Sequence, residues 1–205
     1  MAKVKMSKKM TSIDMTAMCD VAFLLLTFFI LTATAKQPEP LPVDTPSSTV
    51  QVKLPETDLA VITIGDSGKV FFGVKAAEVR KKTLESIAEK YKLQFSEDEK
   101  TKFGLMEEFG VPANQLKVLI SMTSAQRNKK GQQSGIPHDS LDNQLAEWVR
   151  AARNANAEVN QKQLNFAIKG DAKEQYPEIK KVMDILQKQE VNKFNLVTGL
   201  RSDNF

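Results

Sequence analysis

The chain of 205 residues has few of the residues from which catalytic and metal-binding sites are usually built. Its one cysteine, Cys19, excludes an intramolecular disulfide and any metal site made of paired cysteines. Its one histidine, His138, follows a proline in a stretch typical of a loop or of the start of a helix. Because most hydrolase and metalloenzyme sites need more than this, they are excluded as well. We therefore expect a protein that is not an enzyme and holds no metal or other cofactor.

Arginine is scarce, and charge of either sign is moderate. The net charge is +4, five arginines are spread along the chain, and no basic run is interleaved with aromatic residues. A nucleic-acid partner is therefore not expected. With 41% hydrophobic and 26% charged residues, the composition is typical of a soluble globular protein with one unusual segment. The length allows one domain with additional elements, or two small domains.

One long hydrophobic run is present, "TAMCDVAFLLLTFFILTATA", and it has two interpretations. As a signal peptide it has a basic start, an apolar core at 21–31 and small residues at 33–35 that suit cleavage. As a transmembrane helix over 15–35 it has the roughly 20 residues needed to cross about 30 Å of hydrocarbon. Asp14 and Asp20 lie beside the apolar core, which is poor signal-peptide chemistry. We therefore favour the transmembrane helix.

The free energy of membrane insertion allows this helix to contain Asp20. Each strongly apolar residue contributes roughly −0.3 to −0.6 kcal/mol, whereas a central aspartate costs about +2.5 to +3.5 kcal/mol. Nine apolar residues offset the aspartate: Val21, Phe23, Leu24, Leu25, Leu26, Phe28, Phe29, Ile30 and Leu31. The first thirteen residues hold four lysines and no acidic residue. The positive-inside rule therefore places a tail of residues 1–14 in the cytoplasm and the chain beyond Lys36 outside.

Asp20 shares one face of the predicted helix with two threonines. At 100° per residue, Asp20, Thr27 and Thr34 fall on a single stripe. A carboxylate in a span normally faces a protein interior or a water-filled cavity, where an ion can reach it. Two alternatives stay open: hydration at the cytoplasmic interface, or a structural hydrogen bond to a neighbouring helix. Asp20 lies about 7 to 8 Å from a helix centre near Leu25, too deep to reach bulk water easily.

The segment "IDMTAMCDVAFLLLTFFILT" resembles the N-terminal signature of the ExbD/TolR biopolymer-transport family. In that family a "DMTPMIDVVFLLLIFF"-like run contains one aspartate essential for ion-driven work. Asp20 occupies the position of that aspartate, and Asp14 that of an earlier acidic residue. Three later blocks are similar to the family in the same order: "VQVKLPETD", "VITIGDSGKVFFG" and "FAIKGDAKEQYPEIKKVMDILQKQEVNKFNLVT". Together the blocks cover roughly half to two-thirds of the chain.

The chain departs from the family pattern in two respects. Ala17 and Cys19 replace a proline and an isoleucine-like residue beside the aspartate, and Cys19 is interpreted as a small apolar packing residue. Residues from about 91 to 163 have no counterpart in compact family members. We expect this insertion to be a peripheral elaboration, so that its polar loop at 128–134 can be trimmed with little effect on folding.

Five of the eight prolines lie between residues 36 and 57, which predicts an extended linker instead of a packed element. In polyproline geometry, some twenty residues reach on the order of 60 Å. Within this stretch "VQVKLP", residues 50–55, alternates apolar and polar residues and could dock as an edge strand. Residues 58–205 then form the outer domain.

The domain begins with a predicted hairpin, in which "GDSGK" joins the strands "LAVITI" and "VFF". A phosphate-binding loop is not expected, because the Walker spacing is absent and a strand follows. An amphipathic helix is predicted over 76–92. A capping box of Ser96 and Glu99 starts another helix, which Gly110 and Pro112 end.

The second half of the domain is predicted to contain a strand over 116–122, a polar and mobile loop, and a helix over 139–156 in which Trp148 anchors the core. A strand–helix–strand unit with its helix over 174–189 favours parallel pairing. Asp171 is interpreted as a turn residue. The fold class is α+β, with one transmembrane helix, a proline-rich linker, and a periplasmic domain whose helices pack on one face of a small mixed sheet.

The resemblance implies a subunit of a bacterial inner-membrane motor, single-pass, with a cytoplasmic N-terminus and a periplasmic domain. It implies a homodimer, a channel partner of the ExbB/TolQ type around Asp20, and a force transducer of the TonB/TolA type. Asp20 would carry the ion, with Thr27, Thr34 and Asp14 as supporting polar residues. A proton is the simplest carrier, and sodium stays open because Thr27 adds an oxygen. The alternatives are a TolR-like envelope anchor that binds peptidoglycan without ion flux, and a periplasmic enzyme released by signal cleavage.

Overall fold

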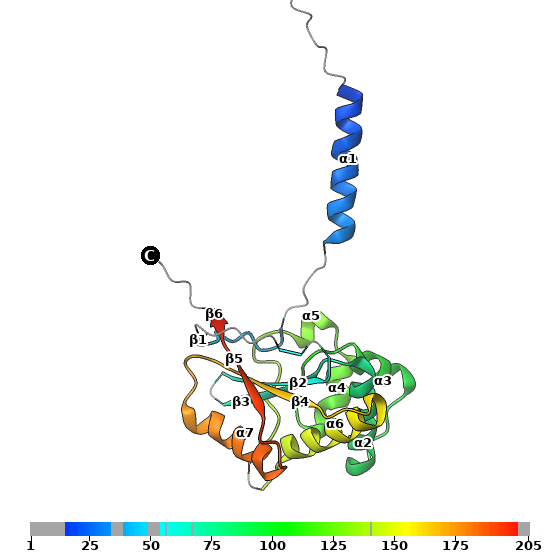
Figure 1. The fold of residues 1–205 in the computed structure, drawn as a ribbon. Coiled ribbons are helices and arrows are strands. Elements are labelled where there is room, and N and C mark those ends of the chain that lie inside the picture. The colour runs from blue at the N-terminus through cyan, green and yellow to red at the C-terminus, as the bar shows by residue number, and fades with distance from the viewer. Residues whose placement is uncertain are drawn as a thin grey trace, which may run out of the picture. The chain divides into compact units, whose positions relative to one another are not determined.

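A computed structural model of the chain describes residues 15–33, 39–48, 54–55, 57–66, 68–139 and 141–200. The chain forms two units, Met1–Pro38 and Glu39–Phe205 (Figure 1). The described residues of the first unit, 15–33, contain one helix, and the second unit is an α+β domain. Of the residues predicted to support ion transfer, Asp14 and Thr34 lie outside the described residues.

Helix α1, Met15–Thr32, is long and apolar enough to cross a membrane. Its threonine hydroxyls are satisfied within the helix: Thr27 Oγ1 donates to the Leu24 carbonyl oxygen at 2.9 Å, and Thr32 Oγ1 to that of Phe28 at 2.7 Å. Such bonds let hydroxyl groups lie in hydrocarbon, where water is absent. The helix predicted over 15–35 is therefore confirmed for residues 15–32.

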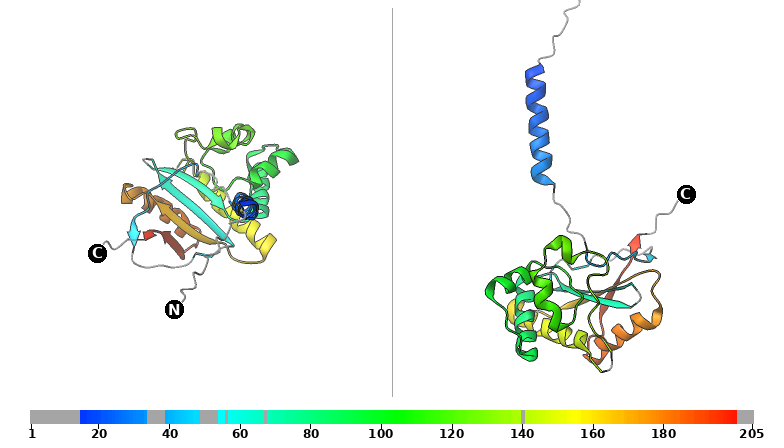
Figure 2. Two further views of the ribbon diagram at one scale, coloured as in Figure 1. Left: turned by 90° about the horizontal axis from the view of Figure 1, so that it is seen from above. Right: turned by 180° about the vertical axis from the view of Figure 1, so that it is seen from behind.

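The domain is built on a four-stranded mixed sheet in the order β3-β2-β4-β5 (Figure 2). The strands are β2 Leu59–Gly65, β3 Lys69–Val74, β4 Asn165–Gly170 and β5 Phe194–Val197. β2 pairs antiparallel with β3 and parallel with β4, and β4 pairs parallel with β5. β1, Ser47–Ser48, and β6, Gly199–Leu200, form a separate parallel pair. The predicted hairpin and parallel crossover are both confirmed.

Helices cover one face of this sheet. The helices α2 Ala77–Tyr91, α6 Gln144–Asn160 and α7 Tyr176–Lys188 lie on this face (Figure 1). The shorter helices are α3 Glu97–Gly104, α4 Leu116–Ser121 and α5 Ser124–Arg127, with a 3-10 turn at Ala113–Gln115. Apolar residues of α2, α6 and α7 form one buried cluster with Ala60, Ile62 and Ile64 of β2. These three alternate along the strand and therefore share its helix-covered face. The α+β class with helices on one face is confirmed.

A local signal in the sequence accounts for the start of α3 but not for its end. The amide of Glu99 donates to Ser96 Oγ, and the amide of Ser96 donates to Glu99 Oε2 at 2.8 Å, so the predicted capping box starts α3. The predicted end of this helix is wrong, because α3 stops at Gly104 and the chain then runs along β3.

Residues 116–122 were expected to form a strand, and this prediction is wrong. Leu116, Leu119 and Ile120 are buried at helical spacing in α4, while Val118 between them is 57% exposed. A short apolar run of this length has no periodicity that separates a strand from a buried helix. Packing against the neighbouring helices decides the outcome.

The insertion is part of the domain core, so the expectation that it is peripheral is wrong. Residues between 91 and 163 supply about half of the buried apolar cluster. Trp148 is fully buried, as predicted, and its ring centroid lies 4.6 Å from that of Phe109. The loop at 128–134 is also anchored, because Gln133 is 3% exposed and accepts a hydrogen bond from the Gly110 amide.

Part of the proline-rich stretch packs on the domain. Leu41 is 6% exposed, and the Ala172 amide donates to the carbonyl oxygen of Asp44 at 2.7 Å. The expectation of an unpacked linker is therefore wrong for residues 39–48. Most of the edge strand predicted at 50–55 lies outside the described residues.

Candidate functional site

Asp20 is the only charged residue of α1. It lies five residues after the start of the helix and has apolar neighbours on both sides. An ionised carboxylate in contact with lipid is costly to insert. Asp20 therefore needs either a proton or a polar protein surface against its side of the helix.

Thr27 lies on the same side of α1 as Asp20, but not beside it. Seven residues correspond to almost two full turns and to a rise of about 10 Å along the axis. Hard cations bind their oxygen ligands at roughly 2.3 to 2.6 Å. A single cation therefore cannot contact the Asp20 carboxylate and the Thr27 hydroxyl of one helix at the same time. The hydrogen of that hydroxyl is also engaged, at the carbonyl oxygen of Leu24.

A nearer oxygen, on Thr16, did not figure among the residues predicted from the sequence. Thr16 precedes Asp20 by four residues in α1, which places it on the same face one turn away, at a rise of about 6 Å. The spacing "T-x-x-x-D" is visible in the sequence. It gives Thr16 a better position than Thr27 for supporting the aspartate.

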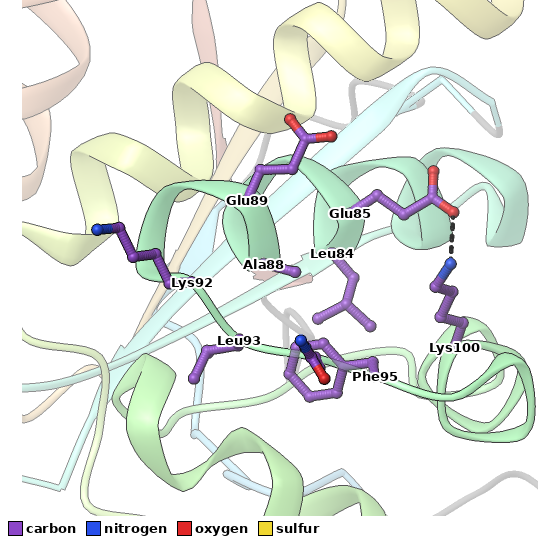
Figure 3. A pocket seen from close by; sticks show the side chains of 9 residues that line it. Leu84, Glu85, Ala88, Glu89, Lys92, Leu93, Phe95 and Lys100 are labelled. Atoms are coloured by element: carbon purple, nitrogen blue, oxygen red, sulfur yellow. Dashed lines mark hydrogen bonds and ion pairs between the residues drawn. The ribbon is translucent and has the colours of Figure 1, made fainter.

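A large open groove lies between α2 and the segment that follows it (Figure 3). Its volume is about 750 Å³. Leu84, Leu93 and Phe95 lie at its base, and Glu85 and Lys100 form an ion pair of 3.1 Å at its rim (Figure 3). The groove therefore combines an apolar base with charged residues at its rim.

The other polar residues singled out in the sequence have structural contacts. His138 Nδ1 lies 3.2 Å from the carbonyl oxygen of Ile136, and its Nε2 lies 3.8 Å from Glu178. Asp171 accepts a hydrogen bond from the Lys173 amide, as expected of a turn residue. Within the part of the chain that the structure describes, no group of three or more His, Cys, Asp or Glu side chains could hold a metal ion.

The comparisons with known proteins agree with the resemblance in the N-terminal half. The family model described as biopolymer transport protein ExbD/TolR matches residues 6–121. No curated protein and no solved structure matches the chain. The matched range contains α1 with Asp20, the hairpin and α2, and it ends before the C-terminal block that also resembled the family. Because it covers more than half of the sequence, the chain belongs to the ExbD/TolR family of biopolymer transport proteins, which work at membranes as transport accessories and are not enzymes.

Proposed function

We propose that the chain is an ExbD-like subunit of an inner-membrane motor, in which Asp20 binds and releases the ion that drives transport across the outer membrane. The observation that supports this most directly is the single carboxylate in an otherwise uncharged helix of 18 residues. Ionisable residues inside a span are rare because they are costly, and a carboxylate in such a position commonly serves ion transfer.

The energies of insertion and of the ion gradient are of similar size. Moving one charge through 100 mV supplies about 2.3 kcal/mol. Keeping an aspartate at the centre of a span costs about 2.5 to 3.5 kcal/mol on the insertion scale. A change between the charged and the neutral form of Asp20 therefore alters the preferred surroundings of α1 by about the amount that the gradient delivers.

A proton suits this site better than sodium. A carboxylate binds a proton with no further ligand, whereas a hard cation prefers several oxygens at short distance. Thr27 is too far along the axis to share a cation with Asp20. Its role in our proposal is to keep the face of α1 polar for water or for a neighbouring helix.

The topology that we propose follows from the charge of the N-terminal segment, and the partners that we propose follow from the family. The lysine-rich N-terminus lies in the cytoplasm, and the α+β domain lies in the periplasm. A channel subunit of the ExbB/TolQ type surrounds α1 of a homodimer. A transducer of the TonB/TolA type receives force from the domain.

Replacing Asp20 by asparagine tests the proposal, because asparagine keeps the volume and hydrogen-bonding groups but does not titrate. The full chain is co-expressed with its channel subunit, and proton flux into proteoliposomes is measured beside co-purification. We expect Asp20→Asn to retain the complex and lose the flux, while Asp14→Asn retains the complex and lowers the flux less than Asp20→Asn does.

Two results would contradict this role for Asp20. Normal flux in Asp20→Asn means that Asp20 is not the carrier, which favours an anchor without ion flux. Loss of the complex in Asp20→Asn means that the carboxylate holds the helices together.

A further inference from the structure

The second face of the sheet, away from the helices, is covered by two irregular segments. One is the strap, defined here as residues 39–46, and the other is the stretch 107–110 of the insertion. A Cβ atom on Gly65 would lie 2.7 Å from Val43 of the strap, and one on Gly73 would lie 2.2 Å from the carbonyl oxygen of Glu107. Both segments therefore cross the sheet directly above a glycine.

Where the two segments meet, three charged residues share a small space. Thr63 and Lys169 are register partners on β2 and β4, so their side chains point to the same face. Thr63 Oγ1 donates to Glu108 Oε1 at 3.2 Å, which brings Glu108 beside Lys169. Lys169 forms an ion pair with Glu39 of the strap. Lys169 is thus paired with Glu39 and acts on Glu108 through its charge alone.

Glu108 is poorly satisfied in this position. Its Oε2 atom is shielded from solvent and has no hydrogen-bond partner among the described residues. Burial raises the pKa of Glu108, the charge of Glu39 raises it further, and Lys169 and the hydroxyl of Thr63 lower it. An ionised carboxylate with an unpaired buried oxygen is unfavourable. This environment therefore favours the neutral form of Glu108 more strongly than bulk water does.

Apolar packing, a hydrogen bond and an ion pair hold the strap on the sheet. Leu41 is its one described residue with a buried apolar side chain, the carbonyl oxygen of Asp44 accepts one hydrogen bond from Ala172, and Glu39 pairs with Lys169. The ion pair is partly shielded, since the Lys169 side chain is 17% exposed. Loss of this pair removes an ionic contact between the strap and β4.

We propose that the strap is a releasable cover of the sheet. An ion pair between Glu39 and Lys169 holds it in place, and it is released when Glu108 ionises and replaces Glu39 as the partner of Lys169. In the closed state Glu39 forms an ion pair with Lys169, and Glu108 is neutral. When Glu108 loses its proton to solvent, its negative charge attracts Lys169 and repels Glu39. The strap is then free to leave, and the domain exposes the second face of its sheet.

The remaining charged groups near Glu108 are Lys75, Arg80 and Glu107. Lys75, at the end of β3, acts on Glu108 through its charge. Arg80 of α2 and the exposed Glu107 line a cavity of about 30 Å³ beside it. β5 contributes Asn195 and Val197 to this face and no charged group. Glu108 is the group whose protonation changes with closure.

The sign of the pH effect follows from linkage. Closure brings the negative charge of Glu39 close to Glu108 and pairs Lys169 with Glu39 instead of Glu108. The pKa of Glu108 is therefore higher in the closed state, which binds the proton more tightly. Closure is therefore favoured at low pH and lost as the pH rises through that raised pKa. The ratio of closed to open strap falls about tenfold for each unit by which closure raises the pKa.

The test measures the distance between the strap and α7 in the full chain in lipid nanodiscs. Spin labels are attached at Asp44→Cys and Lys180→Cys, both exposed positions, in a Cys19→Ser background, and pulsed electron paramagnetic resonance gives the distances at pH 5, 7 and 9. We expect one short distance at pH 5 and a growing long component as the pH rises. Trp148 fluorescence checks that each variant is folded.

Three variants separate the contributions. Glu108→Gln should keep the short distance at every pH, whereas the matched control Glu107→Gln should behave as the parent chain. Glu39→Gln should show the long component even at pH 5. A pH-independent parent chain, a pH response that survives in Glu108→Gln, or a strap that stays closed in Glu39→Gln overturns the proposal.

Discussion

Phe109 offers the sharpest test of whether the insertion belongs to the domain core. It is 4% exposed, and its ring centroid lies 4.6 Å from that of Trp148 and 5.3 Å from that of Phe103. Its backbone also pairs with Phe72 of β3. The side chain therefore joins the insertion to both the sheet and α6. Replacing it by alanine removes a ring that neighbouring side chains cannot easily replace.

The expected cost can be estimated from this packing. Phe→Ala substitutions at buried positions cost about 3 to 5 kcal/mol, from lost burial and from the cavity that remains. For a domain of this size, that corresponds to a fall in Tm of roughly 6 to 20 °C. Phe109→Leu should cost less, because leucine retains much of the apolar volume.

Denaturant unfolding of the full chain in detergent measures this cost directly. Trp148 is the only tryptophan and lies against the altered side chain, so its fluorescence reports unfolding of this core. Leu105→Ala is the control from the same segment, since Leu105 is 75% exposed and its loss should change stability by no more than about 0.5 kcal/mol. If Phe109→Ala costs no more than Leu105→Ala, the insertion is peripheral after all.

Two further predictions concern the loop and the membrane helix. Gln133→Ala should destabilise the domain by about 1 to 3 kcal/mol in the same assay, because it leaves the buried Gly110 amide without its acceptor, whereas the exposed Gln132→Ala should not. Equal stability of the two variants would show that water replaces the glutamine. Thr27→Val should lower proton flux only partly and leave helix insertion unchanged, since the lost hydrogen bond lies within α1. Complete loss of flux would place Thr27 on the ion path itself.

The sequence was most informative where the signal is local. The capping box at Ser96, the turn between β2 and β3, and the apolar stripes of α2 and α7 depend on residues a few positions apart, and all appear in the structure. Asp20 also stood out locally, because a carboxylate is rare in an apolar run of this length. Its role in ion transfer remains a prediction.

Other features depend on contacts between distant residues, and the sequence could not reveal them. Glu108 contacts Thr63 across 45 positions, and Glu39 contacts Lys169 across 130. Nothing near Glu108 in the sequence marks it as buried. Proline-rich composition predicts a free linker for the strap, because the contacts of Leu41, Asp44 and Glu39 that hold it on the domain involve residues far away in the sequence.

The packing of the insertion also determines which edge of the sheet can accept another strand. Phe72 and Phe109 exchange backbone hydrogen bonds of 2.8 and 3.0 Å, and the Ile136 amide donates to the carbonyl oxygen of Val70. The outer edge of β3 is therefore paired along much of its length, which protects it from association. β5 is the opposite edge, and among the described residues no strand pairs with its outer side. A strand from another chain cannot join at β3 without displacing part of the domain core, so the insertion restricts strand addition to β5.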